Sequence, residues 1–161
     1  MDAVDRIVEA WARRDPDVDA TPLEVVGRIL LCAGRLERMI LAALEPFELS
    51  FGDFDVLNTL RRIGSPEGTN PKVLARSALI TSGAVTSRLN RLERRTLIER
   101  TPDPEDGRGV LVALTPDGER IAREALHAVV AADREFLEPL DERQRSALAS
   151  ALKPLVLSAE G

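Results

Sequence analysis

The chain has 161 residues, of which 44% are hydrophobic and 30% are charged. These values describe one folded, soluble domain rather than a disordered chain. A single cysteine excludes an intramolecular disulfide and a multi-cysteine metal site, and an aromatic content of 3% argues against a stacking platform for bases. The first residues do not resemble a signal peptide and no apolar run reaches membrane-spanning length, so we expect a cytoplasmic protein with no membrane partner.

The net charge of −5 is unevenly distributed along the chain. Between Lys72 and Val110, eight basic residues stand against five acidic ones, which gives +3 and leaves −8 for the remainder. Phosphate contacts are made by one face of a protein, so local charge matters more than the total. The distribution is therefore compatible with DNA binding.

Apolar periodicity, capping residues and breakers predict a mainly α chain with one small β-hairpin. Helices are expected at 2–14, 22–45, from Ser50 to the break at Gly64, 71–77, 82–96, 116–137 and after Asp141, with strands at 97–101 and 109–114. A helix pair at 71–96 that runs directly into a hairpin is typical of a winged helix-turn-helix, in which the hairpin is the wing.

The helix at 82–96 carries the clearest chemical signal. On a helical wheel Val85, Leu89 and Leu92 share one side, which predicts a core-facing stripe. Four polar side chains that suit phosphates and base edges lie beyond about 120° from Val85: Ser87, Asn90, Arg91 and Arg94. The helix start at 81–83 offers backbone N–H groups to a phosphate. With the arginine at the hairpin tip, this pattern favours a DNA-gripping segment over an ordinary solvated face.

Arg88 falls about 60° from Val85, on the shoulder of the apolar side. A half-buried guanidinium in that place needs a negative partner, because an unpaired buried charge is costly. The partner is either a carboxylate of the protein or a bound anion, and the sequence leaves both readings open.

The chain resembles the MarR family of winged helix-turn-helix regulators along nearly its whole length. The resemblance is carried by VTSRLNRLERRTLIER (85–100), by Asp106-Gly107-Arg108 and by LTPDG (114–118). It implies a single domain over 1–161, with a helical dimerisation region at 1–49 and 116–161, an extra helix at 2–14, and the winged helix-turn-helix at 50–115. It also implies a homodimer on a pseudo-palindromic operator. The implied DNA-binding residues are Ser82, Thr86, Ser87, Asn90, Arg91, Arg94, Asp106 and Arg108, with the wing aspartate orienting the wing arginine.

Within that family the chain is similar to the urate-responsive branch. The resemblance implies a ligand site made by Trp11, by Asp55 in the segment FDVL (54–57), by Arg88 and by Arg100. Two guanidiniums would match a planar anion, urate or another carboxylate-like metabolite, which would release the protein from DNA. Gly107 departs from the branch, which usually has a second arginine in the wing. The resulting hypothesis is a repressor controlled by a small anion.

Other readings remain open. The regulator could lack this ligand site and answer to another effector or to oxidation of Cys32, although a buried, inert thiol is the favoured reading of that cysteine. The fold could also serve as a helical interaction module that no longer binds DNA. An enzyme is not expected because no nucleophile–base set is present, and no cofactor or metal site is expected around the single histidine, His127. Arg61 and Arg62 are expected to be solvated.

Overall fold

The computed structural model describes residues 1–65, 67–77, 85–106 and 109–159 of the chain. Two of the predicted DNA contacts, Ser82 and Arg108, lie outside these residues. The chain divides into two compact units, 1–39 and 40–161, and each is described by itself. The expected grouping of 1–49 with 116–161 concerns an assembled dimer and stays a prediction.

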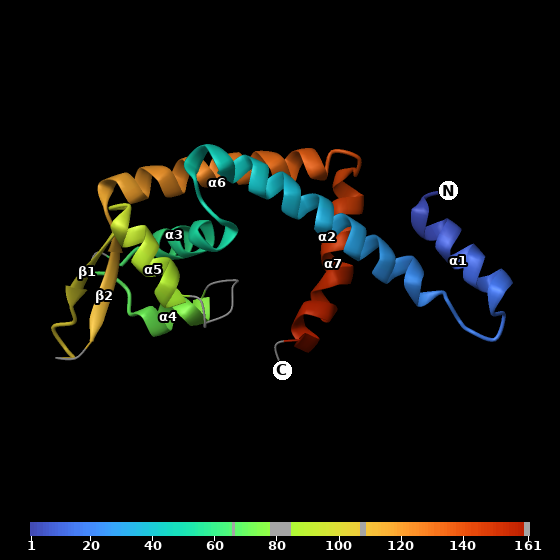
Figure 1. Cartoon of the computed structure of the whole chain (residues 1–161), viewed down its shortest axis with the longest axis horizontal. Helices are drawn as coiled ribbons and strands as arrows, with labels where there is room; N and C mark the ends of the chain where they lie inside the picture. Colours follow the sequence, from blue (N-terminus) through green and yellow to red (C-terminus); the bar gives the residue numbers. More distant parts are fainter. Residues whose placement is uncertain (66, 78–84, 107–108, 160–161) are drawn as a thin grey trace. The chain divides into compact units, whose positions relative to one another are not determined.

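The N-terminal unit is built from two helices, α1 (Ala3–Arg14) and the first part of α2 (Pro22–Leu44) (Figure 1). Asp2 caps α1 and forms a reciprocal capping box with Asp5. Arg28 of α2 donates to Asp2 through Nε at 3.0 Å and also to Asp5. Beneath this ion pair Val4 is buried against Gly27, where an added Cβ would lie 3.1 Å from Val4 Cγ1. The two predicted helices at 2–14 and 22–45 are confirmed.

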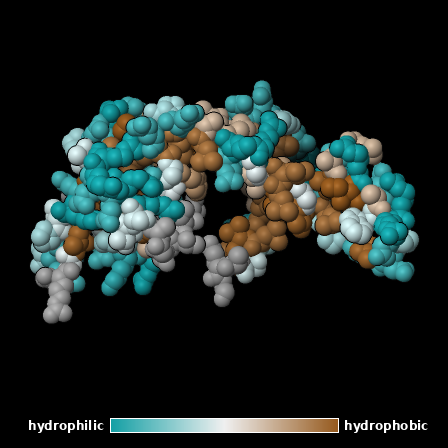
Figure 2. All heavy atoms as spheres, in the orientation of Figure 1, coloured by the Kyte–Doolittle hydropathy of each residue, from teal (hydrophilic) through white to brown (hydrophobic). Residues whose placement is uncertain are grey.

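Most of the apolar side chains of this unit have no cover within the chain. In residues 1–39, all of which are described, Val4 and Ala20 are the buried hydrophobic residues. The large apolar side chains that stay exposed are Met1, Ile7, Trp11, Val18, Leu23, Val25, Val26, Ile29, Leu30 and Leu31. Figure 2 shows hydrophobic side chains, in brown, at the surface over α2. Cys32 is exposed as well, contrary to the expected buried thiol, because no core covers this stretch of α2 within the unit.

The second unit holds the hydrophobic core. After a short 3-10 turn (Glu45–Phe47), α3 (Phe51–Ile63), α4 (Pro71–Ser77) and α5 (Val85–Arg94) pack around side chains that are fully buried. Among them are Leu44, Val56, Leu57, Leu74 and Leu92. Ser50 caps α3 and forms a capping box with Asp53. The helix pair that the sequence predicted is confirmed for α4 and for the described part of the following helix.

The wing is a two-stranded antiparallel sheet of β1 (Ile98–Pro102) and β2 (Val110–Leu114), with Ile98 opposite Leu114. Thr69 extends it by an isolated bridge, because its N–H donates to Val112 O at 2.8 Å and its carbonyl accepts from Val112 N at 3.0 Å. The bridge connects the loop before α4 with the middle of β2. The predicted hairpin is confirmed.

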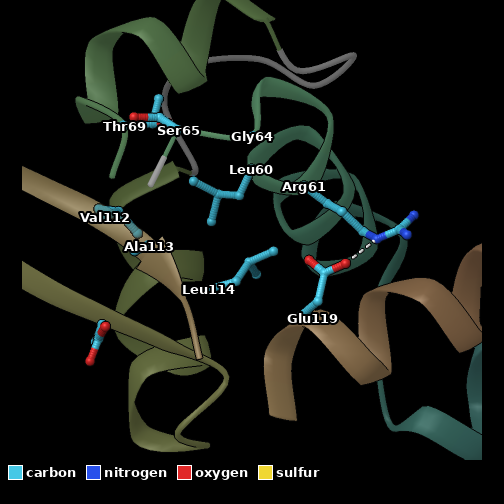
Figure 3. A pocket seen from close by; sticks show the side chains of 10 residues that line it. Leu60, Arg61, Gly64, Ser65, Thr69, Val112, Ala113, Leu114 and Glu119 are labelled. Atoms are coloured by element: carbon cyan, nitrogen blue, oxygen red, sulfur yellow. Dashed lines mark hydrogen bonds and ion pairs between the residues drawn. The ribbon is translucent and has the colours of Figure 1, made fainter. Parts of the chain in front are cut away.

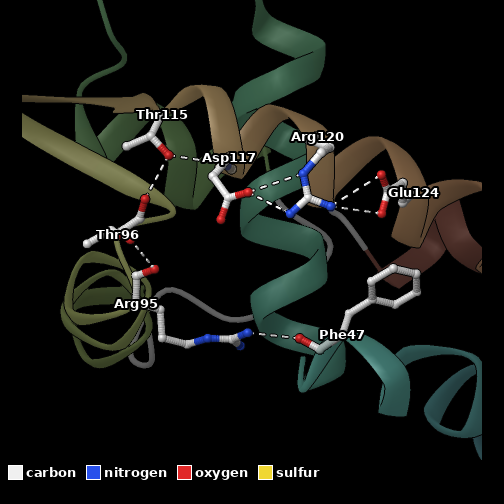
Figure 4. A network of polar contacts seen from close by, with 8 residues as sticks. Phe47, Arg95, Thr96, Thr115, Asp117, Arg120 and Glu124 are labelled. Atoms are coloured by element: carbon white, nitrogen blue, oxygen red, sulfur yellow. Dashed lines mark hydrogen bonds and ion pairs between the residues drawn. The ribbon is translucent and has the colours of Figure 1, made fainter.

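Helix α6 (Pro116–Phe136) starts directly after the wing. Thr115 caps it through a bond from Gly118 N at 3.0 Å, and its hydroxyl donates to Thr96 O at 2.7 Å (Figure 4). A Cβ on Gly118 would lie 1.8 Å from Leu97 O, so glycine is what lets α6 approach the start of the wing. The last helix, α7 (Glu142–Ala159), begins with a reciprocal pair between Asp141 and Gln144, and no side chain from 142 to 158 is buried in the chain.

The observed class is the predicted one, mainly helical with a β-hairpin wing. In the described part of the chain, no helix combines the length and the apolar character that crossing a membrane requires.

Candidate nucleic-acid interface

The outer face of α5 presents the side chains that the wheel placed there. Val85, Leu89 and Leu92 are buried, which confirms the core-facing stripe. The exposed side chains of the same helix are Thr86, Ser87, Asn90, Arg91 and Arg94. They combine hydroxyl, amide and guanidinium groups, which are the donors used on phosphates and base edges. Figure 1 shows α5 beside the two strands of the wing.

The end of α5 is tied to the wing by backbone bonds. Leu97 N donates to Leu92 O at 3.0 Å and Thr96 N donates to Glu93 O at 2.8 Å, which is a Schellman-type ending. Thr96 takes the left-handed position with φ 56°, where a β-branched residue is unusual. Thr115 holds both Thr96 O and, through its N–H, Leu97 O at 3.1 Å. The helix and the wing are therefore joined through one short, hydrogen-bonded segment, 95–97.

Three arginines on one side of α5 and its end form a stripe at i, i+3 and i+7: Arg88, Arg91 and Arg95. Each lies against the segment 47–53 that leads into α3. Arg95 donates to Glu48 O at 2.7 Å and to Phe47 O at 2.9 Å (Figure 4). Sequence reasoning missed Arg95, and the spacing of the three arginines was the available signal.

Arg91 is both exposed and bound within the chain. Its Nε and Nη2 donate to Asp53 Oδ1 at 3.1 and 2.5 Å, and Nη2 also donates to Ser50 Oγ at 3.1 Å. The predicted DNA contact is thus anchored on the capping box of α3, which the sequence did not reveal.

Asn90 is held by the first wing strand. Arg100 donates from Nη2 to Asn90 Oδ1 at 2.8 Å and pairs through Nη1 with Glu93 at 3.0 Å. This bond uses the amide oxygen of Asn90, so its NH2 group keeps both donors for other acceptors.

The predicted ligand residues are only partly brought together. Arg88 lies over the start of α3, where a Cβ on Gly52 would meet its Nε at 2.2 Å, and Asp55 is buried one turn further along that helix. Arg100 instead binds Asn90 and Glu93, which lie about 200° and 140° around α5 from Arg88. Trp11 belongs to α1 of the N-terminal unit and is 47% exposed.

Arg88 shows an unusual polar environment. Its Nη1 is buried and has no hydrogen-bond partner among the described residues. Buried polar atoms of proteins almost always have a partner, so an unsatisfied one calls for an explanation. No carboxylate among the described residues satisfies this atom, so of the two readings of the sequence the structure favours the bound anion.

A pocket of about 220 Å³ lies elsewhere, at the base of the wing between α3, β2 and α6 (Figure 3). Leu60 and Leu114 line its apolar part, and Arg61 and Glu119 pair across its edge with 2.6 Å between Nε and Oε1. None of the predicted ligand or DNA residues lines it. Arg61, expected to be solvated, is therefore paired, and Arg62 donates to Ser77 O at 2.7 Å.

The wing tip is described up to Asp106 and again from Gly109. Gly109 N donates to Asp106 O at 2.7 Å, and Asp103 N donates to Gly109 O at 3.0 Å. The predicted role of the Asp106 carboxylate towards Arg108 falls outside the described residues. Over the described chain, no three of the His, Cys, Asp and Glu side chains are grouped as a metal site would need.

Comparison with known proteins identifies the fold and the family. A sequence model described as the MarR family matches residues 47–109. HTH-type transcriptional regulator PecS of Dickeya dadantii is 31% identical over 149 residues, which cover 92% of this chain and 90% of that protein. Multiple antibiotic resistance protein MarR of Escherichia coli K12 is 32% identical over 109 residues, which cover 67% of this chain and 73% of that protein.

Solved structures agree with these relatives. A crystal structure of a MarR mutant from E. coli, complexed with operator DNA, aligns with a TM-score of 0.71 and 26% identity over 90% of this chain and 96% of that one. The matched proteins are transcriptional regulators rather than enzymes, as the sequence indicated. We conclude that this chain belongs to the MarR family of winged helix-turn-helix transcriptional regulators.

Proposed function

We propose that the protein is a homodimeric repressor that binds a pseudo-palindromic operator and is released from it by a small anion. The observation that carries the DNA-binding part is the outer face of α5, where five polar side chains are exposed next to a wing while the opposite side is buried. Operator binding by the E. coli MarR mutant of the same fold supports this assignment. In the proposal α5 enters the major groove and Arg108 reaches the minor groove.

The homodimer accounts for apolar surface that the chain does not cover. Exposed hydrophobic side chains run along α1 and α2 and recur on α7, at Leu148, Leu155, Val156 and Leu157. Exposed apolar side chains in such numbers are typical of helices that form protein interfaces. Two copies would also place two α5 helices on successive turns of DNA, as a palindromic site requires.

The DNA contact is tested with Arg94→Ala. Arg94 is exposed and its recorded bond is a 3.3 Å contact to Asn90 O, so its removal should leave the fold intact. We expect operator affinity, measured by fluorescence anisotropy, to fall about tenfold or more, with a shallower dependence on salt. Arg123→Ala on α6 is the matched control, because it also removes an exposed arginine, but from another helix. Equal affinities of the two variants would contradict the assignment of α5.

The anion part of the proposal centres on Arg88, Gly52 and Asp55. The buried Nη1 of Arg88 is a donor that an anionic ligand would satisfy, and Asp55 would meet a ring N–H or sense added negative charge. Trp11 would add an apolar face. Arg100 would join only by leaving Asn90 and Glu93, which couples ligand binding to the outer face of α5. Urate and tricarboxylates are the candidate ligands. A family member controlled by another effector, or through the exposed Cys32, is the alternative.

Gly52→Ala offers a selective test of this site. The three atoms nearest to the new Cβ all belong to the guanidinium of Arg88, the far end of a flexible side chain, so the arginine should move while α3 keeps its fold. Urate or citrate should lower the operator affinity of the parent protein by about 10- to 150-fold, the usual range of coupling. That response should vanish in Gly52→Ala and in Arg88→Gln. A parent protein that ignores both anions would refute the ligand assignment, and a peroxide response lost in Cys32→Ser would favour the alternative.

A further inference from the structure

A buried carboxylate of α3 holds an exposed arginine of the DNA-facing helix. The side chain of Asp53 is 3% exposed, whereas that of Arg91 is 45% exposed. Nothing in the winged helix-turn-helix pattern required an acidic residue beneath α5. The pair crosses from α3 to α5 and therefore links the two helices through polar side chains as well as through the core.

The carboxylate of Asp53 is held in position by Ser50, independently of Arg91. Its Oδ2 accepts from the N–H of Ser50 at 3.2 Å and from the hydroxyl of Ser50 at 2.6 Å, while its own N–H donates back to Ser50 Oγ at 3.2 Å. This capping box locks the carboxylate to the first turn of α3. The other oxygen, Oδ1, is left for the arginine. The acceptor therefore has a defined position and direction.

The bond uses one edge of the guanidinium. Asp53 and Ser50 engage Nε and Nη2 of Arg91, and neither of them engages Nη1. The guanidinium is a rigid fork, so fixing one edge also fixes the direction of the other. An arginine held in this way loses less side-chain freedom when it binds a phosphate than one that is free to rotate.

We propose that Asp53 is a positioning residue for DNA binding, which orients Arg91 so that its Nη1 side meets a backbone phosphate. The inference rests on the proposed function, since it takes α5 as the DNA-facing helix. Asp53 stays bound to Arg91 in the complex and touches no nucleotide itself. Ser50 is the third member of this hydrogen-bonded group, because its hydroxyl contacts both the carboxylate of Asp53 and the guanidinium of Arg91.

Salt dependence separates this role from a purely structural one. Arg91→Ala should weaken operator binding by about 10- to 100-fold, the range for a charge-assisted hydrogen bond. It should also lower the slope of log affinity against log salt by about 0.9 per lost phosphate contact, or about 1.8 for a dimer. Asp53→Asn should reproduce the lower slope, although Arg91 is still present, and should weaken binding by about tenfold.

The second measurement is the operator affinity of the double variant, in which Asp53→Asn is combined with Arg91→Ala. If Asp53 acts through Arg91, Asp53→Asn adds no further loss there. Loss of the α3 cap alone would instead weaken both backgrounds equally. Should Asp53→Asn fail to fold, Ser50→Ala serves in its place, since it removes the hydroxyl and leaves the Asp53 carboxylate. Ser50→Ala should lower operator affinity by about threefold when Arg91 is present and should not lower it in the Arg91→Ala background.

Glu119→Gln is the control for removing a carboxylate from an arginine, because the Arg61–Glu119 pair has a similar length of 2.6 Å and joins α3 to α6 rather than to the DNA-facing α5. Its salt slope should equal that of the parent. An unchanged slope or tighter binding in Asp53→Asn would overturn the inference, and tighter binding would mean that Asp53 competes with DNA. If Arg91→Ala and Arg94→Ala both bind like the parent, the proposed DNA face itself fails.

Discussion

The two units of the chain use their side chains in opposite ways. The second unit, 40–161, encloses a core that includes Leu57, Leu74 and Leu92, and its arginines Arg91 and Arg95 bind a carboxylate and backbone carbonyls. The first unit, 1–39, has the amphipathic pattern of a packed helix pair, yet it buries only Val4 and Ala20 among its hydrophobic residues. The start of α1, by contrast, is well bonded: Asp2 and Asp5 form a capping box, and Arg28 donates a hydrogen bond to Asp2.

This difference indicates where the chain depends on something else. A close-packed core of its own lets a unit hold a binding helix in a fixed position, whereas most of the stability of an amphipathic helix comes from packing its apolar face against a second surface. In the proposed function, the unit 40–161 holds the DNA-facing helix on its own core, and the unit 1–39 gains its cover from the second copy of the dimer. Variants in the two units test these two parts of the proposal separately.

The largest effect is expected from Leu30→Glu. Leu30 is 66% exposed in the single chain, so this change would be harmless there, but in the proposed dimer it places a carboxylate in an apolar interface. Two copies, at about 2 kcal/mol each, would raise the dimer dissociation constant roughly 1000-fold. Light scattering after size-exclusion chromatography measures the outcome. Glu37→Gln, at an exposed polar position of the same helix, is the control, and a dimeric Leu30→Glu would remove α2 from the interface.

The second prediction concerns the unit that has its own core. Gly118→Ala brings a Cβ to within 1.8 Å of Leu97 O and 2.8 Å of Leu97 C, both backbone atoms that cannot rotate away. We expect a loss of about 3 kcal/mol, seen as a melting temperature lower by about 6–12 °C. Arg123→Ala, an exposed change on the same helix, should alter the melting temperature little. A Gly118→Ala protein as stable as the parent would mean that α6 and the wing are less closely joined than the structure has them.

Sequence patterns predicted the elements well because each has a local cause. Ser50, Asn70, Thr115 and Asp141 are capping residues whose side-chain oxygens accept from the first turn of a helix, and all four do so in the structure. The wheel likewise separated buried Leu89 from the exposed face of α5, since 3.6 residues per turn is a property of the backbone alone.

The contacts of the candidate site were harder to predict because they join residues distant in sequence. Arg91 meets Asp53 across 38 positions, and Arg95 meets Phe47 across 48. A helical wheel assigns a direction to each arginine but not the segment that lies in that direction. Arg100 illustrates this limit most clearly. The resemblance to the urate-responsive branch grouped it with Arg88 in one ligand site, whereas in the structure it binds Asn90 and Glu93, which lie on another side of α5 from Arg88.

A smaller, opposite effect is expected at the joint between α5 and the wing. Thr96 has a φ of 56°, a conformation that costs a β-branched residue about 1 kcal/mol and glycine almost nothing. Thr96→Gly should therefore raise the melting temperature by about 2–4 °C in thermal denaturation. Thr101→Gly makes the same change at an exposed position of β1 and should lower it, because extended backbone gains nothing from glycine. Two shifts of the same sign would show that Thr96 is not strained.

The smallest expected effect is a loosening of α1 at acidic pH. Each of Asp2 and Asp5 has its pKa lowered from the ordinary 3.8, chiefly by the backbone N–H of the other and further by Arg28. A carboxyl with a lowered pKa in the folded state contributes stability that is present above its ordinary pKa and lost as the pH falls through the lowered one. The attachment of α1 to α2 should therefore weaken below about pH 4. Trp11, the one tryptophan and a residue of α1, reports it through fluorescence anisotropy, while circular dichroism follows the core. Asp5→Asn should shift that anisotropy change, and an identical acid titration of the two proteins would show that Arg28 does not hold α1.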